Sequence, residues 1–126
     1  MLDESSAMMQ STEADKSAIL QAGLAKIRER FIGSLEGRID QFCGLLERLE
    51  NPETEESACQ DIRAEAHKLH GICGSVGFPR MGALAAQLEQ HVDSVIAGPR
   101  PLNTDFVDEL LNTLLDEMEQ SLDGAA

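Results

Sequence analysis

The chain has 126 residues, which is enough for one domain with a single hydrophobic core. Hydrophobic residues make up 42% of it and aromatic residues only 3%, a composition that favours helices over sheets. The formal net charge of −13 would repel the phosphates of nucleic acids and anionic membranes, so neither is expected as a partner.

The N-terminal half predicts a leader followed by a long helical segment. Residues 1–15 are rich in Ser, Met and acidic residues without sustained periodicity, which predicts a disordered leader. Apolar residues then recur every three or four positions, which predicts one amphipathic helix, or two with a kink near Gly33 or Gly37. The apolar positions are Leu20, Leu24, Ile27, Phe31, Leu35, Ile39, Phe42, Leu46 and Leu49.

Three further helices are predicted, from about Glu53 to Val76, from Pro79 to Ile96, and from Asn103 or Thr104 to Leu122. Proline and glycine separate them, because neither residue continues a helix well. The separating runs are Asn51-Pro52, Gly77-Phe78-Pro79 and Gly98-Pro99-Arg100-Pro101.

Amphipathic helices joined by short loops can bury their apolar faces only against one another. We therefore expect an all-α fold, with residues 16–122 forming an antiparallel up-down four-helix bundle and residues 123–126 a frayed C-terminus. No apolar run approaches the roughly 20 residues that span a bilayer. The cysteines, Cys43, Cys59 and Cys73, are odd in number and form no CxxC pair, which argues against a disulfide framework and for a reducing cytoplasm.

His67 is the candidate for chemistry. At about 100° per residue, the apolar residues of the segment 53–76 gather on one side of the helix, and His67 points almost directly away from them. By contrast, His91 is interpreted as a surface or boundary residue, and the three cysteines as small core or boundary residues. The face shared with His67 also carries Gln60, Arg63, Ala64, His70, Gly71 and Gly74.

Gly71 and Gly74 lie one and two turns beyond His67. A glycine inside a helix costs about 1 kcal/mol relative to alanine, so two of them call for a reason. Clearance for a phosphoryl group and a docking protein is one reason. Fraying toward Gly77, or close packing of a neighbouring helix, is the other, and spacing alone does not decide between them.

The charge around His67 is unusual for this chain. Residues 61–80 contain Arg63, Lys68 and Arg80 against two acidic residues, leaving one excess positive charge in a strongly acidic protein. Cations beside an exposed imidazole would stabilise a phosphoryl group through charge-assisted hydrogen bonds. A solvated face of mixed charge is the alternative interpretation.

The run from Ala66 to Phe78 (AHKLHGICGSVGF) resembles the signature of the histidine phosphotransfer (HPt) domain family. That signature has alanine before the phosphorylated histidine, an apolar residue two after it, and glycines four and ten after it. Ala66, Leu69, Gly71 and Gly77 match these positions around His67. With the helical pattern around it, the resemblance extends over most of residues 16–122.

The resemblance implies that His67 is phosphorylated on its outer ring nitrogen and exchanges the phosphoryl group with the aspartate of a response-regulator receiver domain. The chain would be a monomeric phosphoryl carrier rather than an enzyme, supplied by a hybrid sensor histidine kinase. It would need no cofactor of its own, with Mg²⁺ expected on the receiver. An imidazole suits this role, because it is largely neutral near pH 7 and nucleophilic.

The family usually has Lys or Arg three residues after the histidine, where this chain has His70. A neutral imidazole adds no charge, so phosphate stabilisation falls to Lys68, with Arg63 or Arg80 helping. Glu89, on the following helix, matches a family position that faces the active histidine. It is a candidate for orienting the imidazole, or else a solvated surface acid.

Other classes of helical protein share parts of this sequence pattern. A dimerisation domain of a histidine kinase would have an acidic residue after the histidine and then a proline, whereas Lys68 follows here and Gly71 replaces any proline. The phosphoacceptor domain of a chemotaxis kinase belongs to the HPt family itself. A metal-binding bundle would use His67, His70 and Cys73, but Cys73 turns toward the core at about 240° from His67. A non-catalytic scaffold bundle explains the helices and the acidity but not an exposed histidine beside two glycines.

Overall fold

The computed structural model describes residues 2–98 and 101–125, and the side chains of residues 13–98 and 101–124. Within that part every regular element is a helix, as the composition and periodicity predicted, but five helices are formed rather than four. They are α1 (Leu2–Gly33), α2 (Leu35–Glu50), α3 (Glu55–Val76), α4 (Pro79–Ala97) and α5 (Thr104–Ala125).

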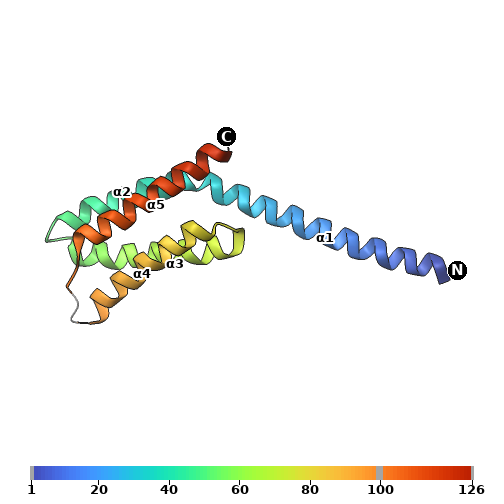
Figure 1. Ribbon diagram of the computed structural model, residues 1–126, viewed down its shortest axis with the longest axis horizontal. Coiled ribbons are helices and arrows are strands. Elements are labelled where there is room, and N and C mark those ends of the chain that lie inside the picture. Colours follow the sequence, from blue (N-terminus) through green and yellow to red (C-terminus); the bar gives the residue numbers. More distant parts are fainter. Residues whose placement is uncertain (1, 99–100, 126) are drawn as a thin grey trace.

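Helices α2 to α5 form an antiparallel bundle (Figure 1). Each packs against the next in the chain, and α5 closes the bundle against α2. Helix α1 contacts the bundle only near its C-terminal end, and its N-terminal part projects away from the other helices (Figure 1). None of the helices in the described part is long and apolar enough to cross a membrane.

Two boundaries predicted from the sequence differ from the structure. Residues 2–15, predicted to be a disordered leader, are the first half of α1, and residues 123–125, predicted to fray, belong to α5. Residues 2–15 contain neither Gly nor Pro, and extending an existing helix requires far less ordering per hydrogen bond than starting one. The predicted division between residues 15 and 16 therefore lies inside a continuous helix.

The break between α1 and α2 falls at Ser34, next to Gly33, where a kink was predicted. The Ser34 hydroxyl donates to the carbonyl oxygen of Phe31 at 2.6 Å and accepts from Arg38 Nε at 3.1 Å. Such local side-chain hydrogen bonds compete with the helical backbone pattern. The backbone of Ser34 nevertheless stays in the right-handed helical region, so the two helices form one interrupted rod.

The described turns of the bundle follow the predicted signals, whereas Pro99 and Arg100 of the predicted break before α5 lie outside the described residues. Helix α3 begins at Glu55, slightly later than predicted, and ends at Val76; Gly77 caps it with a φ of 83°, a left-handed conformation that glycine adopts without strain. Pro79 is the first residue of α4, as predicted. Asn103 caps α5, because its side-chain oxygen accepts the backbone N–H of Phe106 at 3.1 Å.

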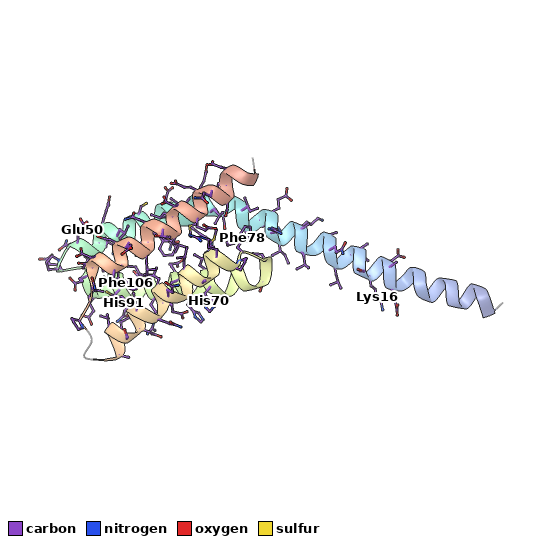
Figure 2. The ribbon with its side chains drawn as sticks, in the orientation of Figure 1. Lys16, Glu50, His70, Phe78, His91 and Phe106 are labelled. Carbon is purple, nitrogen blue, oxygen red and sulfur yellow. The ribbon has the colours of Figure 1, made fainter. Side chains whose placement is uncertain are left out.

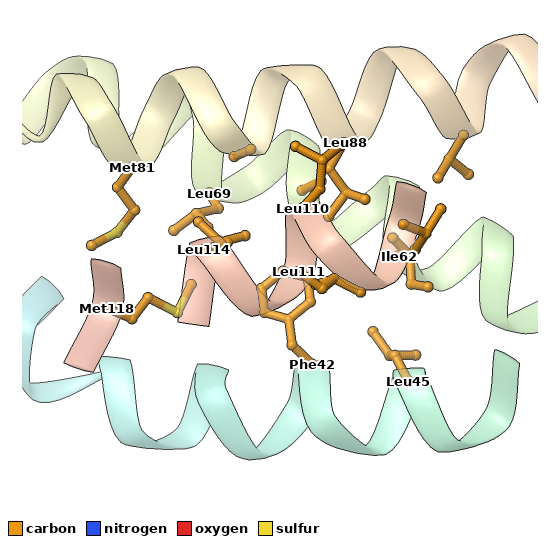
Figure 3. Close-up of a cluster of buried hydrophobic side chains, with 14 of the residues drawn as sticks. Phe42, Leu45, Ile62, Leu69, Met81, Leu88, Leu110, Leu111, Leu114 and Met118 are labelled. Atoms are coloured by element: carbon orange, nitrogen blue, oxygen red, sulfur yellow. The ribbon is translucent and has the colours of Figure 1, made fainter. Parts of the chain in front are cut away.

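The core lies between α2, α3, α4 and α5, with α1 adding Phe31 (Figure 3). Most of its members come from the apolar faces that the sequence predicted, and most of them are fully buried. The largest fully buried side chains are Phe42, Leu35, Ile62, Leu69, Met81, Leu88, Leu111, Leu114 and Met118.

Some residues of the predicted apolar faces are not covered. Ile96 and Phe106 are partly exposed, and Leu20, Leu24 and Ile27 of α1 are about half exposed or more. The residues of α1 are exposed because this helix joins the bundle only near Phe31, so no other helix covers the apolar face of its N-terminal part. Periodicity indicates that a helix has an apolar face but not which molecule covers that face.

Candidate functional site

His67 lies on the exposed face of α3, as predicted. Its side chain is 73% exposed, although Ala66 and Leu69 beside it are fully buried. The burial of these neighbours fixes the rotation of the helix and directs residue 67 to solvent. A buried structural histidine is thereby excluded.

Glu89 of α4 contacts His67. One of its carboxylate oxygens, Oε2, lies 2.5 Å from His67 Nδ1, and the glutamate side chain is only 19% exposed. A carboxylate has no proton to donate, so Nδ1 carries the hydrogen and donates it. The other ring nitrogen, Nε2, then holds a lone pair and points away from the carboxylate. Of the two roles considered for Glu89, the geometry matches that of orienting the imidazole.

His70 contacts the same carboxylate. Its Nδ1 lies 3.6 Å from Glu89 Oε1, so the glutamate sits between two exposed imidazoles one turn apart on α3. Figure 2 shows His70 on the side of the bundle formed by α3 and α4. His70 thus lies near the same carboxylate that contacts His67.

Two of the three predicted phosphate-binding cations are close to His67. Arg63 and Lys68 line a pocket together with His67 and Glu89. Each already has an acidic partner, Asp93 at 3.1 Å for Arg63 and Glu65 at 3.5 Å for Lys68. Exposed ion pairs of this kind contribute only about 0–1 kcal/mol, so a phosphoryl group could replace the carboxylates.

The third cation, Arg80, is held elsewhere. Its Nε lies 3.0 Å from Glu117 of α5, and Arg80 lines neither of the two described pockets that contain His67. The sequence grouped it with the site because of its position in the chain. Its place at the start of α4 turns it toward α5 instead.

The structure removes one of the reasons considered for the two glycines. A Cβ atom built on Gly71 or Gly74 would have no described atom within 4 Å beyond its own stretch of helix, so close packing of a neighbouring helix does not require either glycine. Gly71 lines a second pocket with His67, whereas Gly74 does not. Close packing occurs instead at Gly82 of α4, where a Cβ atom would lie 3.0 Å from Cys73 Cβ.

The second pocket contains a residue that the sequence analysis did not assign to the site. Ile27 of α1 lines it together with His67, Lys68, Gly71, Ile72, Ser75 and Val76. The signal was present in the sequence, because Ile27 belongs to the apolar stripe of the first helix. Only the way α1 packs beside the end of α3 brings that stripe to the histidine.

The remaining reactive side chains lie apart from this pocket. Cys43 is exposed, whereas Cys59 and Cys73 are buried, and burial raises the pKa of both thiols, for Cys73 to about 11. His91, interpreted from the sequence as a surface or boundary residue, is buried and packs edge-on against Phe106. Among the described side chains, no three His, Cys, Asp or Glu residues come together as a metal site would require.

Comparison with known proteins matches the chain to a family. The family model described as Hpt domain matches residues 26–124, which include α2 to α4, all but the last residue of α5, and the end of α1. No curated protein and no solved structure matches the chain.

Proposed function

Since this chain belongs to the Hpt domain family, whose members are phosphocarrier modules of two-component relays, we propose that His67 is the residue that carries the phosphoryl group. The observation that supports this most directly is the contact between His67 Nδ1 and Glu89, which leaves Nε2 exposed with its lone pair available. We further propose that a hybrid sensor histidine kinase supplies the phosphoryl group and that a cytoplasmic receiver domain takes it.

The proposed reaction is a displacement at phosphorus. His67 Nε2 attacks the phosphorus of an aspartyl phosphate, so that an N–P bond forms as the P–O bond to the aspartate breaks. The aspartate leaves as a carboxylate, and the imidazole ring becomes positively charged because Nδ1 keeps its proton. Glu89 faces that proton, and its negative charge stabilises the charged ring.

The reverse transfer uses the same proton. When an acceptor carboxylate attacks the phosphohistidine, the N–P bond breaks and the ring leaves as neutral imidazole, because Nδ1 is already protonated. Without that proton the leaving group would be an imidazolate anion, which is a much poorer one. Glu89 thus favours transfer in both directions, as a carrier requires.

The phosphoryl oxygens need compensation from cations. Lys68 and Arg63 are the cationic side chains that line the pocket, and they are themselves exposed, so their ion pairs with Glu65 and Asp93 are weak. We propose no metal or nucleotide for this chain. Mg²⁺ is expected on the receiver, where it would neutralise charge during transfer.

The experiment is phosphotransfer from receiver domains. A panel of purified receivers, phosphorylated with acetyl phosphate, is incubated with the wild type, with His67→Gln and with His70→Gln. We expect acid-labile, alkali-stable phosphate on the wild type and on His70→Gln, and none on His67→Gln. Circular dichroism should show equal helicity in all three, because both histidines are exposed.

His70→Gln is the matched control, because His70 is on the same helix and near the same carboxylate. Undiminished labelling of His67→Gln would contradict the assignment of His67. A wild type that accepts phosphate from no receiver would favour the alternative, a helical scaffold that has the fold without the chemistry.

A further inference from the structure

The part of α1 that stands clear of the bundle has an uncovered apolar face. Residues 13–30 are exposed throughout, including Leu20, which is 67% exposed, and Leu24, which is 53% exposed. Figure 2 shows Lys16 on this projecting part, away from the bundle. The match to the Hpt domain begins only at residue 26, so most of this segment is an addition to the family domain.

The apolar residues form a stripe that leads to the bundle. Leu20, Leu24 and Ile27 are spaced by four and three residues, which places them on one face of the helix. Phe31 continues the stripe and is buried against the bundle, with its ring centroid 5.2 Å from that of Phe78. Arg28 lies over the same Phe78 ring at 4.9 Å, which further fixes the direction in which α1 leaves the bundle.

The stripe is continuous with the His67 site. Ile27 and His67 line one pocket, together with Gly71 and Ile72. Leu20 lies seven residues before Ile27 on α1, which is about 10 Å farther along the helix. A globular protein seated over His67 on this side therefore contacts Ile27 first and reaches Leu24 and Leu20 by extending past the end of the bundle.

The charge of this segment selects its partner. Residues 16–30 carry Lys16, Lys26, Arg28 and Arg30 against the single acidic residue Glu29, in a chain whose formal net charge is −13. A partner that brings a reactive aspartate and metal-binding carboxylates to His67 is attracted to such a helix. A second copy of the same segment, with the same excess of positive charge, is repelled.

We propose that residues 16–30 form a docking arm that binds the receiver domain whose aspartate reacts with His67. The inference rests on the proposed function, and adds to it a recognition surface that lies mostly outside the matched residues 26–124. The arm raises the affinity for the receiver and takes no part in the transfer step. Its apolar stripe makes the contact, and its basic side chains favour the acidic face of the partner.

The test compares neighbouring residues on different faces of the arm. Leu20→Asp/Leu24→Asp places charges in the stripe, whereas Ile19→Asp changes a residue that is as exposed as Leu20 but points about 100° away. Each variant is phosphorylated and mixed with the receiver that accepts phosphate fastest from the wild type. The initial rate of transfer is measured against receiver concentration.

We expect the double variant to raise KM for the receiver at least about tenfold, because apolar surface that the complex buries becomes charged. The limiting rate constant and the spontaneous hydrolysis of the phosphohistidine should stay within about twofold of the wild type. Ile19→Asp should raise KM far less than the double variant, because it changes the charge of the arm but not its apolar stripe, and should leave the limiting rate constant and the hydrolysis unchanged. All the substituted side chains are exposed, so the folded bundle is retained, which a thermal melt would verify.

Four results would overturn the proposal. An unchanged KM for the double variant would show that the receiver does not use the arm, while leaving the function of His67 intact. An equal loss with Ile19→Asp would mean that the stripe is not the contact. Sedimentation showing a dimer that Leu20→Asp/Leu24→Asp dissociates, with KM unchanged, would assign the face to a second copy. Absence of any phosphoryl exchange by the wild type would remove the proposed function itself, and the docking arm with it.

Discussion

Gly71 offers a prediction in which stability and activity change in opposite directions. It lies in the interior of α3, and a Cβ atom there would meet no described atom within 4 Å outside its own helical segment. Alanine is favoured over glycine in a helix by about 1 kcal/mol, so Gly71→Ala should raise the free energy of unfolding by roughly that amount. For a domain of this size the gain corresponds to a melting temperature roughly 4 °C higher.

Gly71→Leu should also be tolerated by the fold, because leucine is a good helix former and the site is open. The side chain would, however, fill the pocket that Gly71 shares with His67 and Ile27. We expect kcat/KM for transfer to a receiver to fall at least about tenfold, which corresponds to about 1.4 kcal/mol in the transition state. Thermal melts monitored by circular dichroism and transfer kinetics measure the two effects separately.

Gly74→Leu is the comparison. Gly74 is equally open but lines neither pocket that contains His67, so the stability should rise while transfer falls much less than in Gly71→Leu. The rise should be smaller than at Gly71, because Gly74 is in the last turn of α3. If Gly71→Ala lowered the melting temperature, or if both leucine variants slowed transfer equally, clearance at Gly71 would not be the reason for the glycine.

Three further outcomes are expected. Glu89→Ala should slow single-turnover transfer about tenfold. A partly exposed hydrogen bond to a charged group contributes at the lower end of about 1.5–3 kcal/mol. An unchanged rate would mean that the 2.5 Å contact with His67 has no part in transfer. Gly82→Ala should lower the free energy of unfolding, measured by denaturant titration, by about 1–2 kcal/mol, because the new Cβ would lie only 3.0 Å from Cys73 Cβ. A stabilised variant would mean that α3 and α4 move apart without cost. Burial raises the pKa of Cys73 from 9.0 to about 11, with Arg38 opposing the shift, so the folded state keeps a proton that the unfolded state loses. The free energy of unfolding of the wild type should therefore fall between about pH 9 and pH 11, and that of Cys73→Ala should fall less steeply over the same range. Equal slopes for the two proteins would refute the raised pKa of Cys73.

The shared carboxylate suggests how this chain compensates for its departure from the family pattern. His70 stands where a Lys or Arg is usual, and its Nδ1 lies 3.6 Å from Glu89. A permanent cation at that position would compete with His67 for the same carboxylate. With histidine there, Glu89 lies closer to His67 than to His70, and we propose Lys68, which lines both described pockets with His67, as the principal cation for the phosphate.

Much of the fold followed from local chemistry. The breaks at Gly77 and before Pro79 were predictable because a left-handed residue and a residue without an N–H end or begin helices wherever they occur. The outward direction of His67 was predictable because the buried residues of α3 fix the rotation of that helix. These features depend on spacing within one element, which the sequence states directly.

What only the tertiary structure decided is which elements meet. The sequence placed Arg80 with the phosphate and Leu20 in a core, whereas Arg80 pairs with Glu117 of α5 and Leu20 is exposed on the projecting part of α1. It left the role of Glu89 open, and the packing of α4 against α3 brings that carboxylate to His67. Periodicity identifies a face of a helix, but the partner of that face depends on packing between segments far apart in the chain. The sequence alone therefore proposed the histidine and named Glu89 as a candidate beside it, and the structure decided that this carboxylate and helix α1 lie next to that histidine.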